Sequence, residues 1–293
     1  MNARFGCLLA LIILASSARL AVGQPAVCLA PGTVGDADVA RHAADLADPA
    51  LCISERIVED GDTTWRLVVI DNAGTPGPLW AVPHDEEDEA FAAGVRAVRL
   101  YGGTMVAIEN ADARLVDGKD PNQYFARTPE AAATCPATGG ASAAYVEAFL
   151  ADWNRRFPVI GLHANWDGYL AAGGLGEISV RRTDAKMIPF PSPVATGRLA
   201  DEDTIVMLVS TILPADNARG QAAVGWFSER GVHVIYRHVT PSNNGCTLAD
   251  YLTLNAIGPY VNIEVEHGDP VTAHTLVDIV MEYFGRPDSP GML

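Results

Sequence analysis

The stretch LWAVPHDEEDEAF, residues 79–91, decides how the rest of the chain is interpreted. Its apolar run at 79–82 is typical of a buried strand, and the acidic run after Pro83 is typical of the first turn of a helix. His84 therefore stands where a strand of an α/β sheet passes into a helix. Folds of this class tend to bind their ligands at such positions. The stretch predicts an α/β protein with a candidate ligand site at His84.

Two interpretations of His84 are open on this stretch alone. Glu87 follows three residues later, and this His-x-x-Glu spacing lets an imidazole and a carboxylate reach one cation from a single turn. Acidic residues fill every position from 85 to 89, however, so a Glu at this spacing carries little weight. The alternative is a solvated helix start whose carboxylates complement the positive end of the helix dipole. Without further residues, the solvated helix is preferred.

Residues 1–23 have the pattern of a secretory signal peptide. Arg4 precedes an apolar run at 7–15, and small residues lead to an expected cleavage near Gly23-Gln24. No other apolar run approaches the roughly 18–20 residues that a membrane span needs. We therefore expect a soluble mature protein that is periplasmic or secreted.

Four cysteines follow this segment, at positions 28, 52, 135 and 246. Their spacings are long and irregular, which favours disulfides in an oxidising compartment over a metal site. Four cysteines allow about three pairings, and the spacings do not choose among them. We predict Cys28–Cys52, which would tie down the N-terminal segment, and Cys135–Cys246. Free reactive thiols are the alternative.

The chain carries a formal charge of −16 at pH 7 and has no run of Lys and Arg. Nucleic acids and anionic membrane surfaces are therefore not expected as partners, because both attract basic surfaces. The length is sufficient for one α/β domain with a large core. Trp153, Trp166 and Trp226 are expected in that core.

Strand-like and helix-like patterns alternate from about residue 64 onward. Strands are predicted at 65–70, 79–82, 104–108, 159–163, 205–209, 232–236 and 260–266, and helices at 87–100, 141–155, 216–230, 247–256 and 271–284. This order predicts a three-layer α/β/α sandwich with a mixed, mostly parallel sheet. The expected domains are the signal peptide at 1–23, an N-terminal extension at 24–63 and the main domain at 64–293. The segment 110–140 is too long for a plain connection and is predicted to be functional.

Polar residues stand at the ends of two predicted strands. His163 lies at the end of the strand at 159–163, within Leu-His-x-Asn. Glu264 and Glu266 belong to the strand at 260–266, where alternation places both on one face and Val265 on the other. A carboxylate inside an apolar strand is costly to bury unless it has a partner or a function. These residues are therefore candidates for a site.

The order of these motifs resembles the zinc carboxypeptidase superfamily. His-x-x-Glu at 84–87 comes first, then Asp-Pro-Asn-x-x-Phe at 120–125, Leu-His-x-Asn at 162–165 and a Glu within a strand. The resemblance is greatest to the compact bacterial branches, which include the succinylglutamate desuccinylase and aspartoacylase type. It covers roughly residues 65–284, and it favours a zinc site over the solvated helix.

The resemblance implies roles for individual residues. His84, Glu87 and His163 would be the ligands of one zinc ion, which leaves a fourth position for water. The metal would lower the pKa of that water and polarise the scissile carbonyl group. Glu264 aligns best with the general base, and Glu266 is the second choice. Arg114 resembles the arginine that stabilises the oxyanion; the alternative for Arg114 is an ordinary surface arginine of a loop.

One position departs from the family. Its members have Asn-Arg where this chain has Asn122-Gln123, and these two residues would be in contact with the substrate. A neutral Gln cannot form the bidentate pair that Arg makes with a carboxylate. Three explanations are open. Another arginine substitutes (Arg127, Arg181 or Arg182), the substrate has no carboxylate there, or the activity is lost.

The resemblance implies an exported zinc-dependent hydrolase of an amide or peptide bond, which would make 64–293 a catalytic domain. Peptides or N-acyl amino acids are the expected substrates, and the compartment suggests cell-wall peptides. The alternative is a non-catalytic binding protein that retains the fold. A catalyst needs Glu264 or Glu266 beside a bound metal, whereas a binding protein needs neither.

Overall fold

The computed structural model describes residues 27–182 and 186–286. The signal peptide predicted at 1–23, with its cleavage position, lies outside these ranges. Within them, none of the helices combines the length and the apolar character that a membrane crossing requires.

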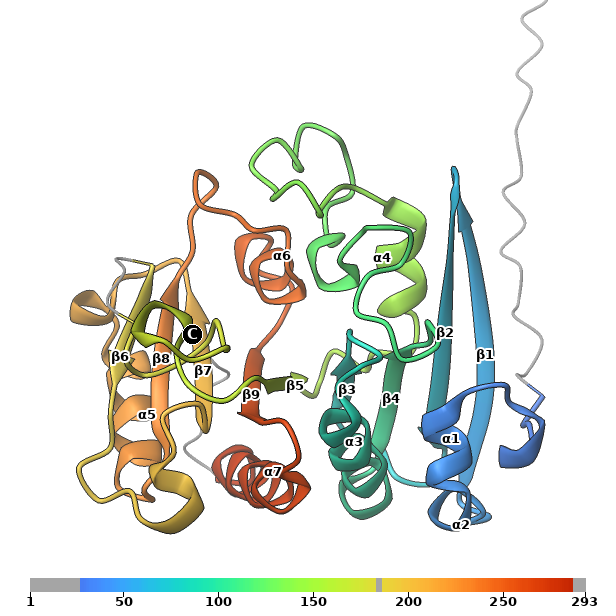
Figure 1. The fold of residues 1–293 in the computed structure, drawn as a ribbon, viewed down its shortest axis with the longest axis horizontal. Coiled ribbons are helices and arrows are strands. Elements are labelled where there is room, and N and C mark those ends of the chain that lie inside the picture. Colours follow the sequence, from blue (N-terminus) through green and yellow to red (C-terminus); the bar gives the residue numbers. More distant parts are fainter. Residues whose placement is uncertain (1–26, 183–185, 287–293) are drawn as a thin grey trace, which may run out of the picture.

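A nine-stranded sheet runs through the described part of the chain, in the order β1-β2-β4-β3-β5-β9-β7-β8-β6 (Figure 1). The strands are β1 Leu51–Asp60, β2 Thr63–Asn72, β3 Leu79–Val82, β4 Gly103–Ile108, β5 Val159–Asn165, β6 Met187–Phe190, β7 Ile205–Ser210, β8 His233–His238 and β9 Tyr260–Glu266. The predicted strands correspond to β2–β5 and β7–β9. The α/β class is therefore confirmed.

The prediction of a mostly parallel sheet was wrong. Four of the described pairings are parallel, namely β3–β4, β3–β5, β5–β9 and β7–β8. The other four, β1–β2, β2–β4, β6–β8 and β7–β9, are antiparallel. The sheet is mixed because a long hairpin adds to one edge and because β7 and β9 run in opposite directions. Side-chain alternation reports which residues share a face, but it contains no information on strand direction.

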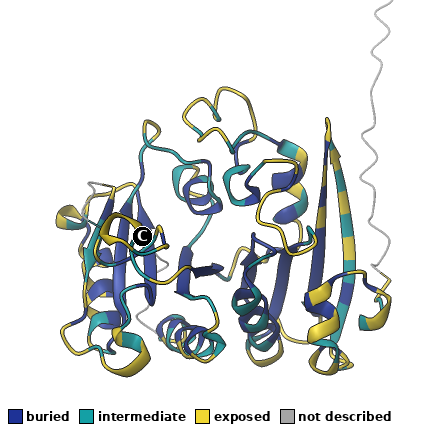
Figure 2. Ribbon diagram, viewed as in Figure 1, coloured by how far each residue is buried: buried dark blue, intermediate teal, exposed yellow. Residues whose placement is uncertain are grey.

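Strand β1 lies within the segment 24–63 that was predicted to be an extension. It pairs with β2 along its whole length, from Leu51 opposite Asn72 to Asp60 opposite Thr63. The predicted Cys28–Cys52 disulfide is confirmed and ties the preceding segment to this strand. Charged residues occupy much of β1, which is largely exposed or half-buried, and so its pattern did not indicate a strand (Figure 2).

Helices cover both faces of the sheet. They are α1 Ala37–Arg41, α2 Ala43–Leu46, α3 Asp88–Tyr101, α4 Ala143–Phe149, α5 Ala218–Ser228, α6 Leu248–Leu254 and α7 Pro270–Phe284. Buried residues of α1, α2, α3, α5 and α7 join one apolar cluster, and those of α4 and α6 join a second. Alternate residues of the central strands are divided between the two clusters, as expected for the two faces of a sheet.

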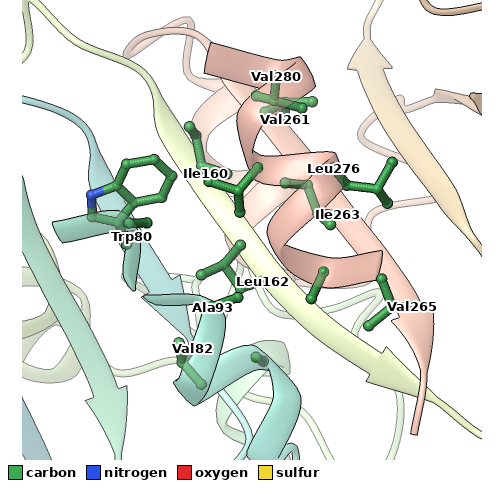
Figure 3. Packing of buried hydrophobic residues seen from close by; sticks show 14 of the residues in the cluster. Trp80, Val82, Ala93, Ile160, Leu162, Val261, Ile263, Val265, Leu276 and Val280 are labelled. Atoms are coloured by element: carbon green, nitrogen blue, oxygen red, sulfur yellow. The ribbon is translucent and has the colours of Figure 1, made fainter. Parts of the chain in front are cut away.

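The first cluster fixes the strands that carry the polar candidates. It includes Ile160 and Leu162 of β5 and Val261 and Ile263 of β9, together with the fully buried Leu276 of α7 (Figure 3). Each such side chain stabilises the fold by about 1.5–3 kcal/mol relative to an exposed position. His163 directly follows Leu162 and Glu264 directly follows Ile263, so both side chains face the opposite side of the sheet.

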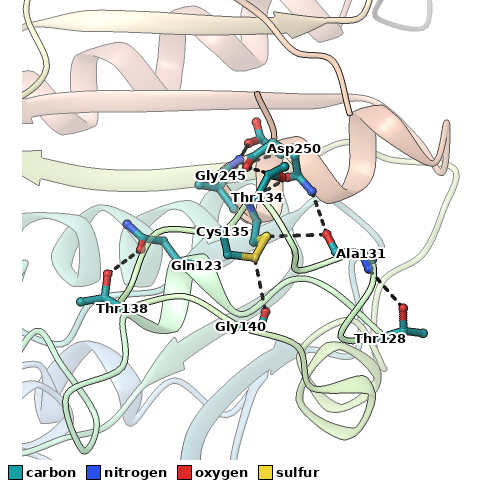
Figure 4. The surroundings of a disulfide bond; sticks show 12 residues. Gln123, Thr128, Ala131, Thr134, Cys135, Thr138, Gly140, Gly245 and Asp250 are labelled. Atoms are coloured by element: carbon teal, nitrogen blue, oxygen red, sulfur yellow. Dashed lines mark hydrogen bonds between the residues drawn. A yellow bond between two sulfur atoms is a disulfide. The ribbon is translucent and has the colours of Figure 1, made fainter. Parts of the chain in front are cut away.

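The predicted Cys135–Cys246 disulfide is also confirmed. It joins the long segment between β4 and α4 to the loop that precedes α6, across 111 residues of sequence (Figure 4). The backbone N–H of Phe125 donates a hydrogen bond to the carbonyl oxygen of Cys246, at 2.9 Å. The predicted functional segment is therefore fastened to a second loop on the same side of the sheet.

Candidate metal centre and active-site cavity

His84 and Glu87 lie between β3 and α3 and are almost fully buried. His84 follows β3 after Pro83, and Glu87 is the N-cap residue of α3. Their exposed fractions are 2% and 1%, so the pair does not form a solvated helix start. A buried imidazole and a buried carboxylate at a helix N-terminus require partners.

The third predicted ligand, His163 on β5, meets this pair. The Nδ1 atom of His84 lies 2.7 Å from Oε1 of Glu87, and the Nδ1 atom of His163 lies 3.1 Å from Oε2. Within residues 27–182 and 186–286, these three are the group whose ligand atoms could hold a metal, all within 4.8 Å of one another. The fold therefore brings together residues that are 76 positions apart in sequence.

Asp120 completes the surroundings of His84. Its Oδ1 lies 2.9 Å from Nε2 of His84 and also accepts the backbone N–H of Asn122. A carboxylate in this place holds the proton on Nε2 and leaves the Nδ1 lone pair directed toward the centre. Asp120 opens the Asp-Pro-Asn motif, for which the sequence predicted no role at this residue. That motif was the available signal.

Opposite charges balance in this group. Burial by itself would lower the pKa of His84, but the carboxylates of Glu87 and Asp120 outweigh it and raise that pKa to about 9. Burial by itself would raise the pKa of Glu87, but His84 and His163 hold it well below its usual range. The two carboxylates therefore favour the positively charged form of His84.

The donor set fits zinc. Two imidazole nitrogens and one carboxylate are ligands that catalytic zinc sites use, with a fourth position left for water or substrate. Both Nδ1 atoms point at Glu87, so an ion placed among them would replace the hydrogen bonds that now join the three side chains. Binding would then release protons, as is usual for metal sites built from titratable ligands.

Glu264 lies beside this centre, in a cavity of about 500 Å³ that His84, Glu87 and His163 also line. The parallel pairing of β5 with β9 places it opposite His163. Its side chain is 6% exposed, and its Oε1 accepts a 2.7 Å hydrogen bond from Nδ2 of Asn262. Burial raises the pKa of Glu264 to about 7. A carboxyl group of this kind is suited to accept a proton near neutral pH.

Asn262 and Glu266 are the neighbours of Glu264 on the same face of β9. Asn262 did not enter the sequence prediction, because an Asn two residues before a Glu in a strand has no distinctive spacing. Glu266, the second choice for the base, shares the face of Glu264 but pairs with Asn165 and does not line the cavity. The structure therefore offers Glu264, and not Glu266, to the centre.

Arg114 reaches the centre from the loop after β4. Its Nη1 lies 3.0 Å from Oε1 of Glu87 and 3.2 Å from Oε1 of Glu86, and its Nη2 lies 4.0 Å from Oδ2 of Asp120. It lines the cavity while its side chain stays 42% exposed, so it is a surface arginine of the loop that also reaches the centre. Its guanidinium is available where negative charge would develop on a substrate.

Asn122 and Gln123 also line the cavity, at the short helix η2 Pro121–Gln123. The three arginines proposed to replace the family's Arg do not line it. Arg127 pairs with Glu147, Arg181 pairs with Glu202, and Arg182 donates a hydrogen bond to the carbonyl oxygen of Glu177. The placement of Arg127 in the substrate site is therefore not reproduced.

Comparisons with known proteins add little. No family model and no curated protein sequence matches the chain. Among solved structures, one described as a "putative carboxypeptidase" from Burkholderia mallei matches with 13% sequence identity and a TM-score of 0.37. The match covers 82% of this chain and 65% of the neighbour, so it spans less than two thirds of that protein. A similarity of this size assigns neither a fold nor an activity to this chain.

Proposed function

We propose that the chain is a zinc-dependent hydrolase that cleaves an amide or peptide bond. The proposal rests on the buried group of His84, Glu87 and His163, with Glu264 in the same cavity. Zinc bound there would activate a water molecule and polarise the carbonyl group. The chain's own residues supply proton transfer and charge.

Glu264 is the proposed general base. Its carboxylate would take a proton from the attacking water and pass it to the departing amine. Asn262 holds this carboxylate by its 2.7 Å hydrogen bond, which limits its orientations. Arg114 would balance the negative charge on the carbonyl oxygen, and Asp120 would keep His84 in the tautomer that presents Nδ1.

We also propose the architecture, the compartment and the substrate class that the family resemblance implies. Helices on both faces of the mixed sheet support a three-layer sandwich of the zinc carboxypeptidase type. The two disulfides support an exported protein, periplasmic or secreted, whose expected substrates are peptides, including cell-wall peptides, or N-acyl amino acids.

The first test is the metal content of the purified protein and of two histidine variants. We expect about one zinc per chain in the wild type and none in His163→Ala, because the variant loses one of three protein ligands. His238→Ala is the matched control, since His238 makes its contact with the Thr211 carbonyl oxygen and not with the cavity. A wild-type protein that takes up no metal when zinc is supplied would contradict the proposal.

A non-catalytic binding protein is the second candidate, and Gln123 is the observation that favours it, because the family's Arg is missing there. The buried Glu264 argues against it, since a binding protein has no need for an ionisable group at this position. Hydrolysis of peptides by the zinc-loaded wild type, lost in Glu264→Gln with zinc retained, would exclude a binding protein.

A further inference from the structure

The cavity is crowded with negative charge. Five carboxylates line it, those of Glu86, Glu87, Asp120, Glu177 and Glu264. Arg114 supplies the one guanidinium among the described lining residues, and it is already shared by Glu86, Glu87 and Asp120. The double positive charge of one bound zinc ion would compensate part of this excess of negative charge. A substrate carboxylate away from the metal would meet several like charges and one guanidinium that already pairs with three carboxylates.

The side chains of Asn122 and Gln123 offer amide N–H donors instead. Oδ1 of Asn122 accepts the backbone N–H of Leu248 at 3.3 Å, and Oε1 of Gln123 accepts the hydroxyl of Thr138 at 2.7 Å (Figure 4). Both residues line the cavity, and with both oxygens engaged their amide N–H groups are the side-chain donors that they can offer to a ligand. A neutral carbonyl or hydroxyl oxygen is a suitable acceptor for such groups.

The Gln123 side of the cavity is held in place by covalent and hydrogen bonds. The backbone N–H of Gly140 donates to the Gln123 carbonyl oxygen at 3.0 Å, and Asp120 N–H donates to the Thr138 carbonyl oxygen at 2.8 Å. Thr138 lies three residues after Cys135, which the disulfide fixes to Cys246. The donor pair is therefore preorganised and does not depend on a flexible loop.

Exposed apolar side chains also line the cavity. Trp166 was expected in the core, but 55% of it is exposed, and its ring lies tilted against the ring of His267, with centroids 4.5 Å apart and 40° between the planes. Leu175 is 69% exposed, and all three residues line the cavity. An exposed aromatic and aliphatic surface beside a polar centre is suited to an apolar substrate side chain.

We propose that the cavity accepts a peptide whose group beside Asn122 and Gln123 is an uncharged amide, with an apolar side chain against Trp166. The bond cleaved would then be internal to a peptide, or adjacent to a carboxamide, and not next to a free terminal carboxylate. Water adds its oxygen to the acyl carbon, the carbon–nitrogen bond breaks and the amine leaves with a proton. The cleavage step in this inference rests on the proposed hydrolase function, whereas the binding preference does not.

The test separates binding from hydrolysis. Two libraries of N-acetylated tetrapeptides are used, which are identical except that one ends in a carboxamide and the other in a carboxylate. Each is incubated with the zinc-loaded Glu264→Gln protein, and the peptides that stay bound to the protein are quantified by mass spectrometry. We expect retention of carboxamide peptides to exceed that of carboxylate peptides by about tenfold or more, and the retained set to be enriched in apolar residues. The zinc-loaded wild type is assayed in parallel for cleavage of both libraries.

A gain-of-charge variant provides the decisive comparison. Gln123→Arg, made in the same background, should shift the ratio toward carboxylate peptides by about tenfold, because it supplies a bidentate partner. Gln221→Arg is the matched control, since Gln221 lies on α5 outside the cavity and should leave the ratio unchanged. Preferential retention of carboxylate peptides, retention of neither library, or no shift in Gln123→Arg would overturn the inference. Retention of carboxamide peptides without cleavage by the wild type would uphold it and refute the hydrolase.

Discussion

Glu264 is predicted to make the metal-free protein less stable as the pH rises. The carboxyl group is 6% exposed, and Asn262 is its one hydrogen-bond partner within the described residues. Replacement by Gln removes the charge and keeps the shape, and the new amide oxygen can still accept the bond from Asn262. A comparison of the wild type with Glu264→Gln therefore isolates the free energy of ionising this buried group.

The magnitude follows from the pKa difference. Burial raises the pKa of Glu264 from 4.5 to about 7 in the folded chain. Each unit of difference corresponds to about 1.36 kcal/mol, so the total is about 3 kcal/mol. Because the folded-state pKa is the higher one, the stability is fully present below pH 4.5, is lost progressively as the pH rises to about 7, and is constant above that.

The assay is urea unfolding of both proteins in the presence of a chelator, at a series of pH values from 4 to about 9. We expect equal free energies of unfolding near pH 4, with Glu264→Gln more stable by about 3 kcal/mol above pH 7. Subtraction removes the contributions of the other titrating groups, which both proteins share. A difference that does not change with pH, or a less stable variant at high pH, would refute the reasoning. It would mean that the ionised Glu264 is stabilised by its neighbours.

Two further predictions concern the partner of His84 and a buried ion pair outside the cavity. Asp120→Asn should weaken zinc binding by about 10–100-fold in a chelator competition, because His84 loses its charged partner. Asp117→Asn, in the same loop but outside the cavity, is the control. Equal zinc affinities of Asp120→Asn and the wild type would contradict the prediction. Asp250→Ala should lower the free energy of unfolding by about 3–5 kcal/mol, because it leaves the buried Arg237 guanidinium without the carboxylate that it contacts at 2.6 and 2.7 Å. A loss below about 1 kcal/mol in urea unfolding would show that Arg237 finds another partner.

Local patterns in the sequence were sufficient for much of the fold. Short apolar runs predicted seven of the strands, since a strand buried on both faces must be apolar throughout. The pattern failed at β1, which is exposed and charged, and at β6 Met187–Phe190, which is short and contains Pro189. The predicted helix at 141–155 ends early, at Phe149. Trp153 closes the following turn by donating its Nε1–H to the Phe157 carbonyl oxygen.

The candidate ligands were also accessible from the sequence. His84 and Glu87 are joined by one turn, so their spacing alone indicates that they can share a ligand. His163 stands at the end of an apolar strand, and strand ends of an α/β sheet meet at one edge. The two disulfide pairings were predicted as well, although the spacings allowed other pairings.

Strand register and loop packing decided the remaining features. Alternation places Glu264 and Glu266 on the same face, but the pairing of β5 with β9 determines which of them lies opposite His163. Asp120 acquired its role from a contact across the fold with His84, 36 residues away, which no local spacing encodes. Asn262 acquired its role from Glu264, two residues further along the same strand, because the fold turns that carboxylate toward the cavity. The sequence by itself determined which residue types are present and which strand ends carry them. The tertiary structure decided which of them face the cavity, because that choice depends on distances between segments that are far apart in the chain.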